Sequence, residues 1–468
     1  MTHPAGPLPS PWPRSVIDQL LWPGLPGPQG QQMLALTAQL QLAEWWTPEA
    51  LERAQLAQLD ALVRHAGTHV PYYAKRLRRW KVDTSVPLTW EAFRRIPVLK
   101  RAEVQRAGES LYASATPPAH GRVGSAQTSG SSGRPVTLMK TELTLLLWRA
   151  VTLRDHLWHR RDMMAPTCHI RETGGLRAPP PDGATHATWG SAAEDAFQTG
   201  PSHTLSVTAD IASQARWIAA RKPRYLLVYP SGLRGLLDHW EATGTAPRGI
   251  EQVRTISETL RPELRDRVQS VLGARLVDLY SSQEVGYIAL QCPDHAHYHV
   301  QSETIHVEVL REDGEPCAPG EAGRVVVTPL HHFGTPLLRY EIGDGAEVGP
   351  PCPCGRGLPV LTRVLGRIRH MLHFPDGRKV WPTFAVGRFV KLAPIRQWRI
   401  VQVALDHLEL HLCTTRPVTP EEEQAVVRSI LDKLGHPFRV TVIYRPEGIP
   451  SGANGKYEDF LCAIDPDA

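Results

Sequence analysis

Apolar residues in the first part of the chain recur at steps of three and four, which is the spacing of one face of an α-helix. This pattern runs over residues 31–79, where Thr47 can cap a helix and Pro48 can occupy its first position. Shorter helices are predicted at Trp90–Phe93 and Lys100–Gly108. The N-terminal part is therefore expected to be helical.

Between residues 122 and 330 the pattern changes to short β-rich runs that alternate with helical stretches. Runs such as YLLVY at 225–229 and ARLVDLY at 274–280 are separated by helical patterns at 209–221 and 261–273. Strands that alternate with helices are typical of α/β domains with parallel sheets. We therefore expect a large α/β domain with mostly parallel strands.

Beyond a boundary near Gly366 the pattern predicts a strand over 397–415, a helix at Pro420–Leu434 opened by Thr419, and a further strand. This is a compact α+β unit, and a small mobile domain after a large one can close over a substrate. The first thirty residues are rich in proline and glycine, which predicts a poorly ordered arm. The expected organisation is an arm at 1–30, a large domain at 31–365 and a small lid domain at 366–468.

Composition excludes several classes of protein. The chain has 468 residues, of which 42% are hydrophobic, and 52 Lys and Arg stand against 47 Asp and Glu. These values are typical of a folded protein of two or three domains and exclude a disordered or collagen-like chain. No basic cluster indicates nucleic-acid binding, no apolar run approaches the roughly 18–20 residues that cross a bilayer, and no secretory signal is visible. We therefore expect a cytoplasmic protein that binds neither nucleic acid nor membranes.

A Ser/Gly-rich segment at residues 128–135, TSGSSGRP, is the first candidate for chemistry. Its glycines let backbone N–H groups converge on an anion, and its hydroxyls and Arg134 add donors and charge. The segment lacks the Gly-Lys-Ser/Thr ending of a Walker loop, and a plain Ser/Gly surface loop is the alternative. The residues that would bind phosphate are Thr128, Ser129, Gly130, Ser131, Ser132 and Gly133.

Three later segments place charged side chains at turns. Tyr280 and Glu284 follow an apolar strand, at the edge where open α/β sheets bind ligands, and a carboxylate there can hold Mg²⁺. Asp344 follows a tight turn and can accept both hydroxyls of a ribose, while Arg367 can meet a phosphate or sugar oxygen. Lys456 lies in a Gly-rich loop near the C-terminus. Taken separately, these segments read more readily as a polar helix cap, ordinary turns and a solvated lysine.

In their order and separation these segments resemble the adenylate-forming superfamily, and within it the phenylacetate–CoA ligase-like branch. The resemblance covers most of the chain and includes Val70-Pro71-Tyr72-Tyr73 and IPVLK at 96–100. It also includes Cys292…His299 and Cys352-Pro-Cys354, which are similar to relatives such as the adenylyl synthetase of a deazaflavin coenzyme and proteins of polysaccharide and natural-product clusters. The fold implied is a large adenylation domain followed by a small mobile domain.

The resemblance also implies catalytic roles. Residues 128–133 would wrap the phosphates of ATP, and Glu284 would hold Mg²⁺. Lys456, brought in by the small domain, would meet the α-phosphate and the substrate carboxylate in the transition state.

Further residues would bind the nucleoside and the acid by the same resemblance. Tyr280 would pack on the adenine, Glu258 would lie close to it, and Asp344 would bind the ribose hydroxyls beside Arg367. The acyl pocket would be lined by His169, Gly174, Tyr229 and Pro230.

The implied activity is ATP-dependent adenylation of an organic carboxylic acid, with release of pyrophosphate and transfer of the acyl group to CoA or a carrier thiol. The alternatives are transfer of AMP to a hydroxyl, amide formation, or a non-catalytic relative that binds nucleotide. The oligomeric state stays open, with a homodimer as one alternative.

The chain departs from the family at several positions. Arg134 stands where the phosphate loop usually has lysine, and Gln283 stands before Glu284 where the family has Thr or Ser. Arg369-His370 replaces an acidic pair at the hinge, and residues 373–377 replace the glycine-rich strip that lines the pantetheine tunnel. These changes leave the adenylation half-reaction better supported than the thioester half.

The seven cysteines are an odd number, which argues against a disulfide framework. Cys292 begins a His-rich segment, and Cys352 and Cys354 follow sixty residues later. Thiolates and imidazoles suit Zn²⁺ in a four-ligand structural site, although the C-x-C spacing equally fits free thiols beside a His-rich loop. By the family resemblance, the zinc ligands are Cys292, His299, Cys352 and Cys354, with His295 and His297 as alternative histidines.

Overall fold

The computed structural model describes residues 13–127, 135–173, 177–380, 382, 392–450 and 457–464. The chain divides into two compact units. The larger unit comprises Met1–Ile342 and Ala346–Val364, and the smaller unit comprises Gly343–Gly345 and Leu365–Ala468.

Helices fill the N-terminal part of the larger unit, as the sequence predicts. In α2 the Thr47 hydroxyl accepts a hydrogen bond from the backbone N–H of Ala50 at 3.3 Å, and Pro48 occupies the first turn. Within the segment expected to be an arm, Arg14 donates its backbone N–H to Ala196 at 3.0 Å. Among the described helices none is both long and apolar enough to cross a membrane. The helices here are α1 (Pro28–Ala43), α2 (Pro48–His69), α3 (Pro71–Ala74), α4 (Arg76–Arg79), α5 (Trp90–Arg94) and α6 (Arg101–Ala107), with 3-10 helices η1 (Gly108–Leu111) and η2 (Pro118–His120).

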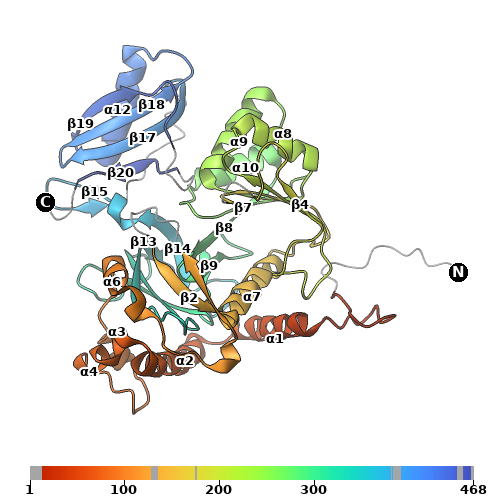
Figure 1. The fold of residues 1–468 in the computed structure, drawn as a ribbon. Helices are drawn as coiled ribbons and strands as arrows, with labels where there is room; N and C mark the ends of the chain where they lie inside the picture. The colour runs from red at the N-terminus through yellow and green to blue at the C-terminus, as the bar shows by residue number, and fades with distance from the viewer. Residues whose placement is uncertain are drawn as a thin grey trace. The chain divides into compact units, whose positions relative to one another are not determined.

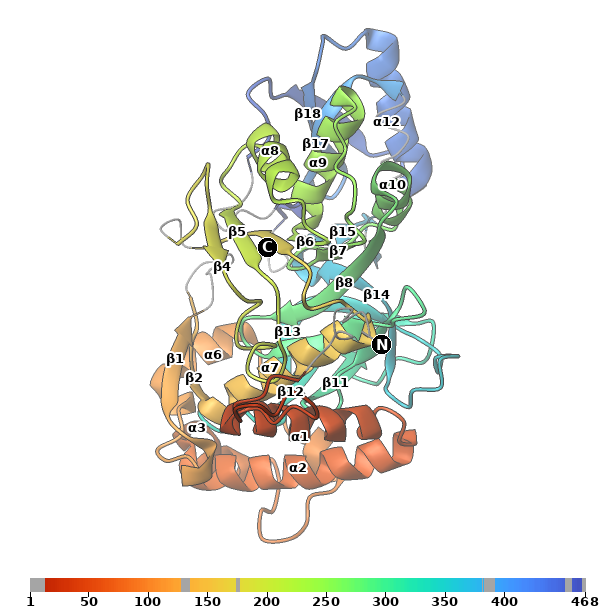
Figure 2. The ribbon, with the colours of Figure 1, turned by 90° about the vertical axis from the view of Figure 1, so that its right-hand side faces the viewer.

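A β-hairpin links these helices to a long helix. Strands β1 (Val123–Gln127) and β2 (Thr137–Thr141) pair antiparallel, and α7 (Glu142–Trp158) follows directly. Thr141 caps α7, because its hydroxyl accepts from the backbone N–H of Thr144 at 3.3 Å. In both views of the ribbon the hairpin lies beside α6 (Figures 1 and 2).

A twelve-stranded sheet runs in the order β11-β12-β13-β14-β10-β9-β8-β7-β6-β3-β5-β4. Strands β5, β3, β6, β7 and β8 pair parallel, as expected where helices connect successive strands. The other pairings in this sheet for which a register is defined are antiparallel, and a short turn joins β8 to β9. The α/β class is thus confirmed, and those five strands form the parallel part of this sheet.

The bounds of these strands and their connecting helices are β3 (Thr167–Arg171), β4 (Ala184–His186), β5 (Ser202–Ser206), α8 (Ile211–Arg221), β6 (Tyr225–Val228), α9 (Pro230–Thr243), β7 (Gln252–Thr255), α10 (Glu263–Leu272), β8 (Arg275–Ser282), β9 (Gly286–Gln291), β10 (Tyr298–Val300), β11 (Ile305–Leu310), β12 (Ala322–Pro329), β13 (Tyr340–Val348) and β14 (Val360–Arg367). Helices α8, α9 and α10 lie together over the parallel strands (Figure 1). Their shared core includes Ile218, Leu226, Leu236 and Val253, all with no exposed surface.

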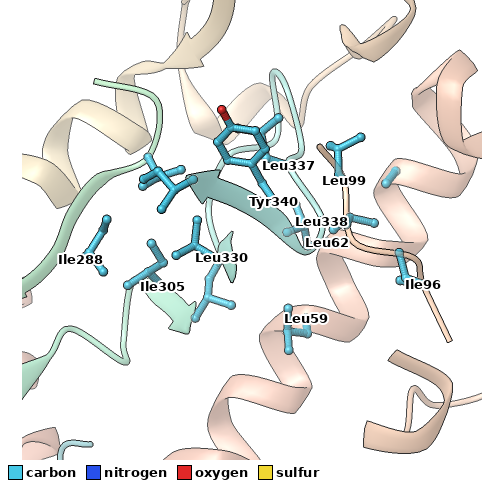
Figure 3. Close-up of a cluster of buried hydrophobic side chains, with 14 of the residues drawn as sticks. Leu59, Leu62, Ile96, Leu99, Ile288, Ile305, Leu330, Leu337, Leu338 and Tyr340 are labelled. Atoms are coloured by element: carbon cyan, nitrogen blue, oxygen red, sulfur yellow. The ribbon is translucent and has the colours of Figure 1, made fainter. Parts of the chain in front are cut away.

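A second core joins the N-terminal helices to the antiparallel half of the sheet (Figure 3). Leu59 and Leu62 from α2 pack in the same cluster as Ile288 of β9 and Tyr340 of β13. Leu99 forms a parallel bridge with Tyr340. This packing fixes the start of α6, two residues after Leu99, against the sheet.

The smaller unit is an α+β fold with its own core. The run predicted as one strand over 397–415 is a hairpin, β17 and β18, because the chain turns at Leu405 and Asp406. The predicted helix is present with the predicted cap, since Thr419 accepts from the backbone N–H of Glu422 at 3.3 Å. The elements are η3 (Ile368–His370), β15 (Leu372–His373), β16 (Lys379–Val380), β17 (Ile395–Ala404), β18 (His407–Thr414), α12 (Pro420–Leu434), β19 (Arg439–Tyr444) and β20 (Phe460–Cys462), with sheet order β19-β18-β17-β20.

Candidate functional site

Polar groups meet at the carboxyl ends of neighbouring parallel strands in the larger unit. After β6, the Tyr229 hydroxyl accepts a hydrogen bond from the backbone N–H of Glu172, which follows β3, at 3.1 Å. After β7, the Glu258 carboxylate accepts from the backbone N–H and the hydroxyl of Ser231 at 2.8 and 2.9 Å. This is the edge at which open α/β sheets bind ligands.

The turn that carries Glu258 has an unusual backbone. Ser257 has φ of 72°, which is uncommon for a non-glycine residue and costs on the order of 1 kcal/mol. The contact of Glu258 with Ser231, in the first turn of α9, helps to hold this turn, because a carboxylate is stabilised at a helix N-terminus.

Two of the predicted acyl-pocket residues come from adjacent parallel strands, with His169 on β3 and Tyr229 directly after β6. His169 on β3 pairs with Leu227 on β6, two residues before Tyr229. The His169 ring lies 3.3 Å from the Thr167 hydroxyl, and burial lowers the pKa of His169 to about 3, so the ring is neutral. Burial likewise raises the pKa of Tyr229, and Pro230 begins α9. These three residues therefore share one region of the larger unit.

The turn from β8 to β9 carries the other candidates of the larger unit. Tyr280 is buried in β8 opposite Ala289. Glu284 is only 9% exposed, although its carboxylate is ionisable. Such a group needs a charged partner when it lies so far from water.

Arg101 supplies that partner. Its Nη1 donates to Glu284 Oε1 at 2.8 Å. One residue before Glu284, the backbone carbonyl of Gln283 accepts from Lys140 Nζ at 2.7 Å. Burial lowers the pKa of Lys140, while the nearby Glu284 carboxylate raises it. Two cations thus flank the turn on which the candidate metal-binding carboxylate stands.

Two candidates for nucleoside binding meet in the smaller unit. Arg367 Nε lies 3.2 Å from Asp344 Oδ1, so the two form an ion pair. Gly343 has φ of 83°, and a Cβ there would lie 3.4 Å from Arg367 Nη1. At the altered hinge, His370 Nε2 lies 2.9 Å from a carboxylate oxygen of Glu458.

Several sequence-predicted site residues lie outside the described residues. They are Thr128, Ser129, Gly130, Ser131, Ser132, Gly133, Gly174 and Lys456.

The cysteine and histidine segments come together in the larger unit. Cys292 follows β9, its backbone N–H donates to His297 at 2.9 Å, and His299 lies on β10, which pairs with β9 and β14. The loop before β14 brings Cys352 and Cys354 to the same place. Cys292 and Cys352 have their sulfurs 3.9 Å apart, and the Cys354 sulfur lies 3.4 Å from His299 Nε2.

This cluster fits a tetrahedral zinc ion. One ligand atom each from Cys292, His297, His299 and Cys352 lies within 4.8 Å of the others. Zn–S bonds of about 2.3 Å and Zn–N bonds of about 2.0 Å at a tetrahedral angle place two sulfurs about 3.8 Å apart and a sulfur and a nitrogen about 3.5 Å apart. The Cys292–Cys352 and Cys354–His299 distances are near these values, whereas His297 Nε2 lies only 2.9 Å from the Cys352 sulfur. Burial lowers the pKa of His299 to about 4, which keeps the imidazole neutral for a metal.

The sequence patterns missed Arg101 and Lys140. Arg101 is 183 residues from Glu284, and Lys140 is 143 residues from Gln283. Arg101 directly follows the IPVLK run, and Lys140 lies on the strand after the Ser/Gly segment, but neither position carries a local signal for its partner.

No protein-family model matches the chain. Curated relatives include the phenylacetate-coenzyme A ligase of Thermus thermophilus, 24% identical over 453 residues that cover 88% of this chain and 96% of the relative. The phenylacetate-coenzyme A ligase of Escherichia coli is 22% identical, and the match covers 73% of this chain and 77% of that relative. The resemblance to the phenylacetate–CoA ligase-like branch is confirmed.

Solved structures share the fold of this chain. A 2-hydroxyisobutyryl-CoA ligase in its postadenylation state, in complex with R3-HIB-AMP, superposes with a TM-score of 0.71 at 19% identity. The match covers 91% of this chain and 92% of that chain. The match shows that this chain, with its large mixed sheet and separate α+β unit, shares the fold of that CoA ligase.

Proposed function

We propose that this protein adenylates an organic carboxylic acid with ATP, releases pyrophosphate, and transfers the acyl group to CoA or a carrier thiol. The observation that carries this proposal is similarity along 88% of the chain to a phenylacetate-coenzyme A ligase. The structural neighbour named as a 2-hydroxyisobutyryl-CoA ligase in complex with R3-HIB-AMP supports an acyl-adenylate as the intermediate.

The first half-reaction is a displacement at phosphorus. A carboxylate oxygen of the acid bonds to the α-phosphorus, and the bond from that phosphorus to the bridging oxygen breaks, so pyrophosphate leaves with the electron pair. In the second half-reaction the thiol sulfur, having lost its proton, bonds to the acyl carbon, and AMP leaves. Negative charge builds on the phosphate oxygens in the first step, so the protein must supply cations there.

The residues of the larger unit would share this work. Glu284 would hold Mg²⁺, which supplies positive charge to the phosphate oxygens when bound. One carboxylate fits this ion, because Mg²⁺ keeps several waters and takes other ligands from substrate phosphates. Residues 128–133 would bind the phosphates, and Tyr280 and Glu258 would border the adenine. His169, Gly174, Tyr229 and Pro230 would line the acyl pocket.

The residues of the smaller unit would bind the sugar and the reacting group. Asp344 would accept the ribose hydroxyls beside Arg367, and the ion pair between them supports this role by fixing the carboxylate. Lys456 would neutralise charge on the α-phosphate. Removal of such a cation costs about 3–4 kcal/mol of transition-state stabilisation, or two to three decades in rate.

We further propose that the cysteine cluster holds a structural Zn²⁺ through Cys292, His299, Cys352 and Cys354. His297 Nε2 lies 2.9 Å from the Cys352 sulfur, which is shorter than the spacing of two ligands on one tetrahedral ion. We therefore assign His297 as a hydrogen-bond partner of Cys352 and not as a ligand. Such outer contacts orient metal ligands.

The organisation of the chain and its cellular context complete the proposal. We divide it into an arm at 1–30, an adenylation domain at 31–365 and a lid domain at 366–468. We place the protein in the cytoplasm, with a small carboxylic acid and a thiol as its partners.

A pyrophosphate-release screen tests the function. Aryl, fatty and amino acids are offered with ATP and Mg²⁺, with and without CoA, and products are identified by mass spectrometry. The expected result is pyrophosphate release that depends on one class of acid, with a thioester formed when CoA is present. A hydroxyl-linked AMP product, an amide, or ATP binding without turnover would each replace the proposal with one of its alternatives.

Lys456→Ala provides the matched variant. It should bind ATP as the wild type does and lose most acyl-adenylate formation. Normal ATP–pyrophosphate exchange in Lys456→Ala, with an acid that the wild type activates, would contradict the role of Lys456.

A further inference from the structure

Lys140 has a position that the proposed function leaves unexplained. It is the fourth residue of β2, opposite Gly124 in the hairpin, and its side chain reaches the turn between β8 and β9. The hydrogen bond to the Gln283 carbonyl uses one of the three N–H donors of the ammonium.

The charge of Lys140 has little compensation. Among the described residues its ammonium forms no ion pair within 4 Å, and its hydrogen-bond partner is an uncharged carbonyl. The carboxylate that interacts with it, Glu284, is engaged by Arg101 at 2.8 Å. The other titratable group that it affects is His332, which is buried and whose pKa is held well below its usual value by burial and by Lys140 itself. A half-buried cation with two remaining donors, beside a carboxylate already paired, is suited to an anionic ligand.

We propose that Lys140 is an anion-binding residue of the adenylation site, and that its ammonium contacts an anionic oxygen of the ligand held at Glu284. This inference rests on the proposed function, because Glu284 marks the ligand position. Two sources supply such an oxygen: the phosphates of ATP and the carboxylate of the acid. Lys140 also holds the Gln283 carbonyl, and so it fixes the turn that presents Glu284.

The sequence contains a second, separate reason for a cation at this place. The Ser/Gly segment lacks the lysine that its family usually has, and Arg134 stands there instead. A point charge on a flexible stem and a planar guanidinium bind phosphate differently. Lys140 lies on β2, the strand that follows this segment in the sequence, and it supplies an ammonium.

Three variants separate the charge of Lys140 from its hydrogen bond. Lys140→Met removes both, Lys140→Gln keeps an N–H donor without charge, and Lys140→Arg keeps charge. Lys75→Met, at an exposed lysine, serves as the control. Thermal unfolding confirms that each variant is folded, and binding is measured by calorimetry with ATP and Mg²⁺, with pyrophosphate and with AMP.

If Lys140 contacts a phosphate of ATP, Lys140→Met and Lys140→Gln should bind ATP and pyrophosphate tenfold to a hundredfold more weakly than the wild type. Lys140→Arg should bind them about as tightly as the wild type. If Lys140 instead contacts the carboxylate of the acid, Lys140→Met and Lys140→Gln should bind ATP as the wild type does. Their KM for the acid that gives the largest signal in the pyrophosphate-release screen should rise tenfold or more. If both Lys140→Met and Lys140→Gln keep ATP binding and the KM for the acid within twofold of the wild type, the proposal is overturned. If only Lys140→Met is impaired, Lys140 merely braces the Gln283 carbonyl.

Failure of the proposed function gives a different result. In that case no acid releases pyrophosphate with the wild type, and the ATP and pyrophosphate titrations alone decide the role of Lys140. If Lys140→Met then binds ATP and pyrophosphate as tightly as the wild type, the anion-binding role of Lys140 is rejected.

Discussion

Arg101 donates a hydrogen bond to Glu284 across 2.8 Å, and so pairs the carboxylate that the proposed function assigns to Mg²⁺. Both side chains are largely shielded, at 25% and 11% exposure. The position of Arg101 at the start of α6 is fixed, because Leu99, two residues earlier, exchanges backbone hydrogen bonds with Arg339 and Glu341. A divalent cation at Glu284 must therefore share the carboxylate with Arg101 or displace it.

Removal of the Arg101 charge should strengthen metal binding. In Arg101→Met the Glu284 carboxylate no longer has a competing cation, and a partly buried ion pair of this kind is worth about 1 kcal/mol. We expect the dissociation constant for Mn²⁺, used as a probe for Mg²⁺ and measured by electron paramagnetic resonance, to fall about fivefold. Glu284→Gln should abolish this binding.

Arg95→Met is the control for that experiment, because Arg95 pairs with Glu91 on the exposed side of α5. It should leave Mn²⁺ binding unchanged. Weaker Mn²⁺ binding in Arg101→Met would show that Arg101 orients Glu284 for the metal instead of competing with it.

The proposed zinc site predicts different results for its two neighbouring histidines. The purified wild type should contain about one zinc per chain, and His299→Ala and the double variant Cys352→Ser/Cys354→Ser should lose it. His297→Ala should keep the metal with an affinity lower by about 10- to 100-fold, because His297 acts through Cys352. Metal content is measured by inductively coupled plasma mass spectrometry.

Cys317→Ser is the matched control, since Cys317 is a free thiol outside the cluster. It should retain its zinc. Less than a tenth of an equivalent of zinc in wild-type protein never exposed to a chelator would reject the site. If His299→Ala keeps its zinc and His297→Ala loses it, His297 is the ligand and His299 is not.

The ion pair of Asp344 and Arg367 predicts a nucleotide dependence. In Asp344→Ala the ribose hydroxyls lose their acceptor and Arg367 loses its partner, so ATP and AMP should both bind at least tenfold more weakly. The variant and the wild type should bind 2′,3′-dideoxy-ATP equally, because that ligand lacks the hydroxyls. A penalty of the same size with the dideoxy nucleotide would mean that Asp344 acts only by holding Arg367.

Local patterns predicted the elements whose determinants lie within a few residues. Thr47 and Pro48 open α2, and Thr419 opens α12 with a reciprocal contact to Glu422, all of which is visible in the sequence. The prediction of a single strand over 397–415 was wrong, because the segment forms a hairpin. Alternating apolar residues continue through the turn of a hairpin and do not mark where the chain folds back.

Contacts between distant segments could not be predicted in the same way. The pairing of Arg101 with Glu284 depends on how Leu99 packs against Tyr340, and that packing is decided by the whole core of the larger unit. The sequence also left the histidine of the cysteine cluster open, since spacing alone does not distinguish His295, His297 and His299. The register of β10 against β9 and β14 puts His299 at the cluster, and His297 also lies there, within reach of Cys352. His295 stacks on His297 but is not one of the side chains grouped at the cluster.

Asp278 gives a prediction for stability against pH. Its carboxylate is buried in β8 and accepts from Thr255 and Tyr298, both at 2.6 Å. Burial raises the pKa of Asp278 from 3.8 to about 6, although these hydrogen bonds and the charge of Arg265 act in the opposite direction. As pH rises from about 4 to about 6, the unfolded chain releases this proton and the folded protein retains it. The stability that the protonated carboxyl contributes is present below the unfolded pKa and is lost over this window.

Asp278→Asn removes the titration and keeps an acceptor for one of the two hydroxyls. The free energy of unfolding of the variant, relative to the wild type, should therefore increase by about 2 kcal/mol between pH 4 and pH 7. Urea unfolding followed by tryptophan fluorescence at several pH values measures it. Asp60→Asn is the contrast, because the hydrogen bond from Arg64 outweighs burial and lowers the pKa of Asp60, so its effect lies at lower pH and should be constant above pH 5. A difference between Asp278→Asn and wild type that does not change with pH would show that Asp278 ionises normally in the folded protein, with the two hydroxyls outweighing its burial.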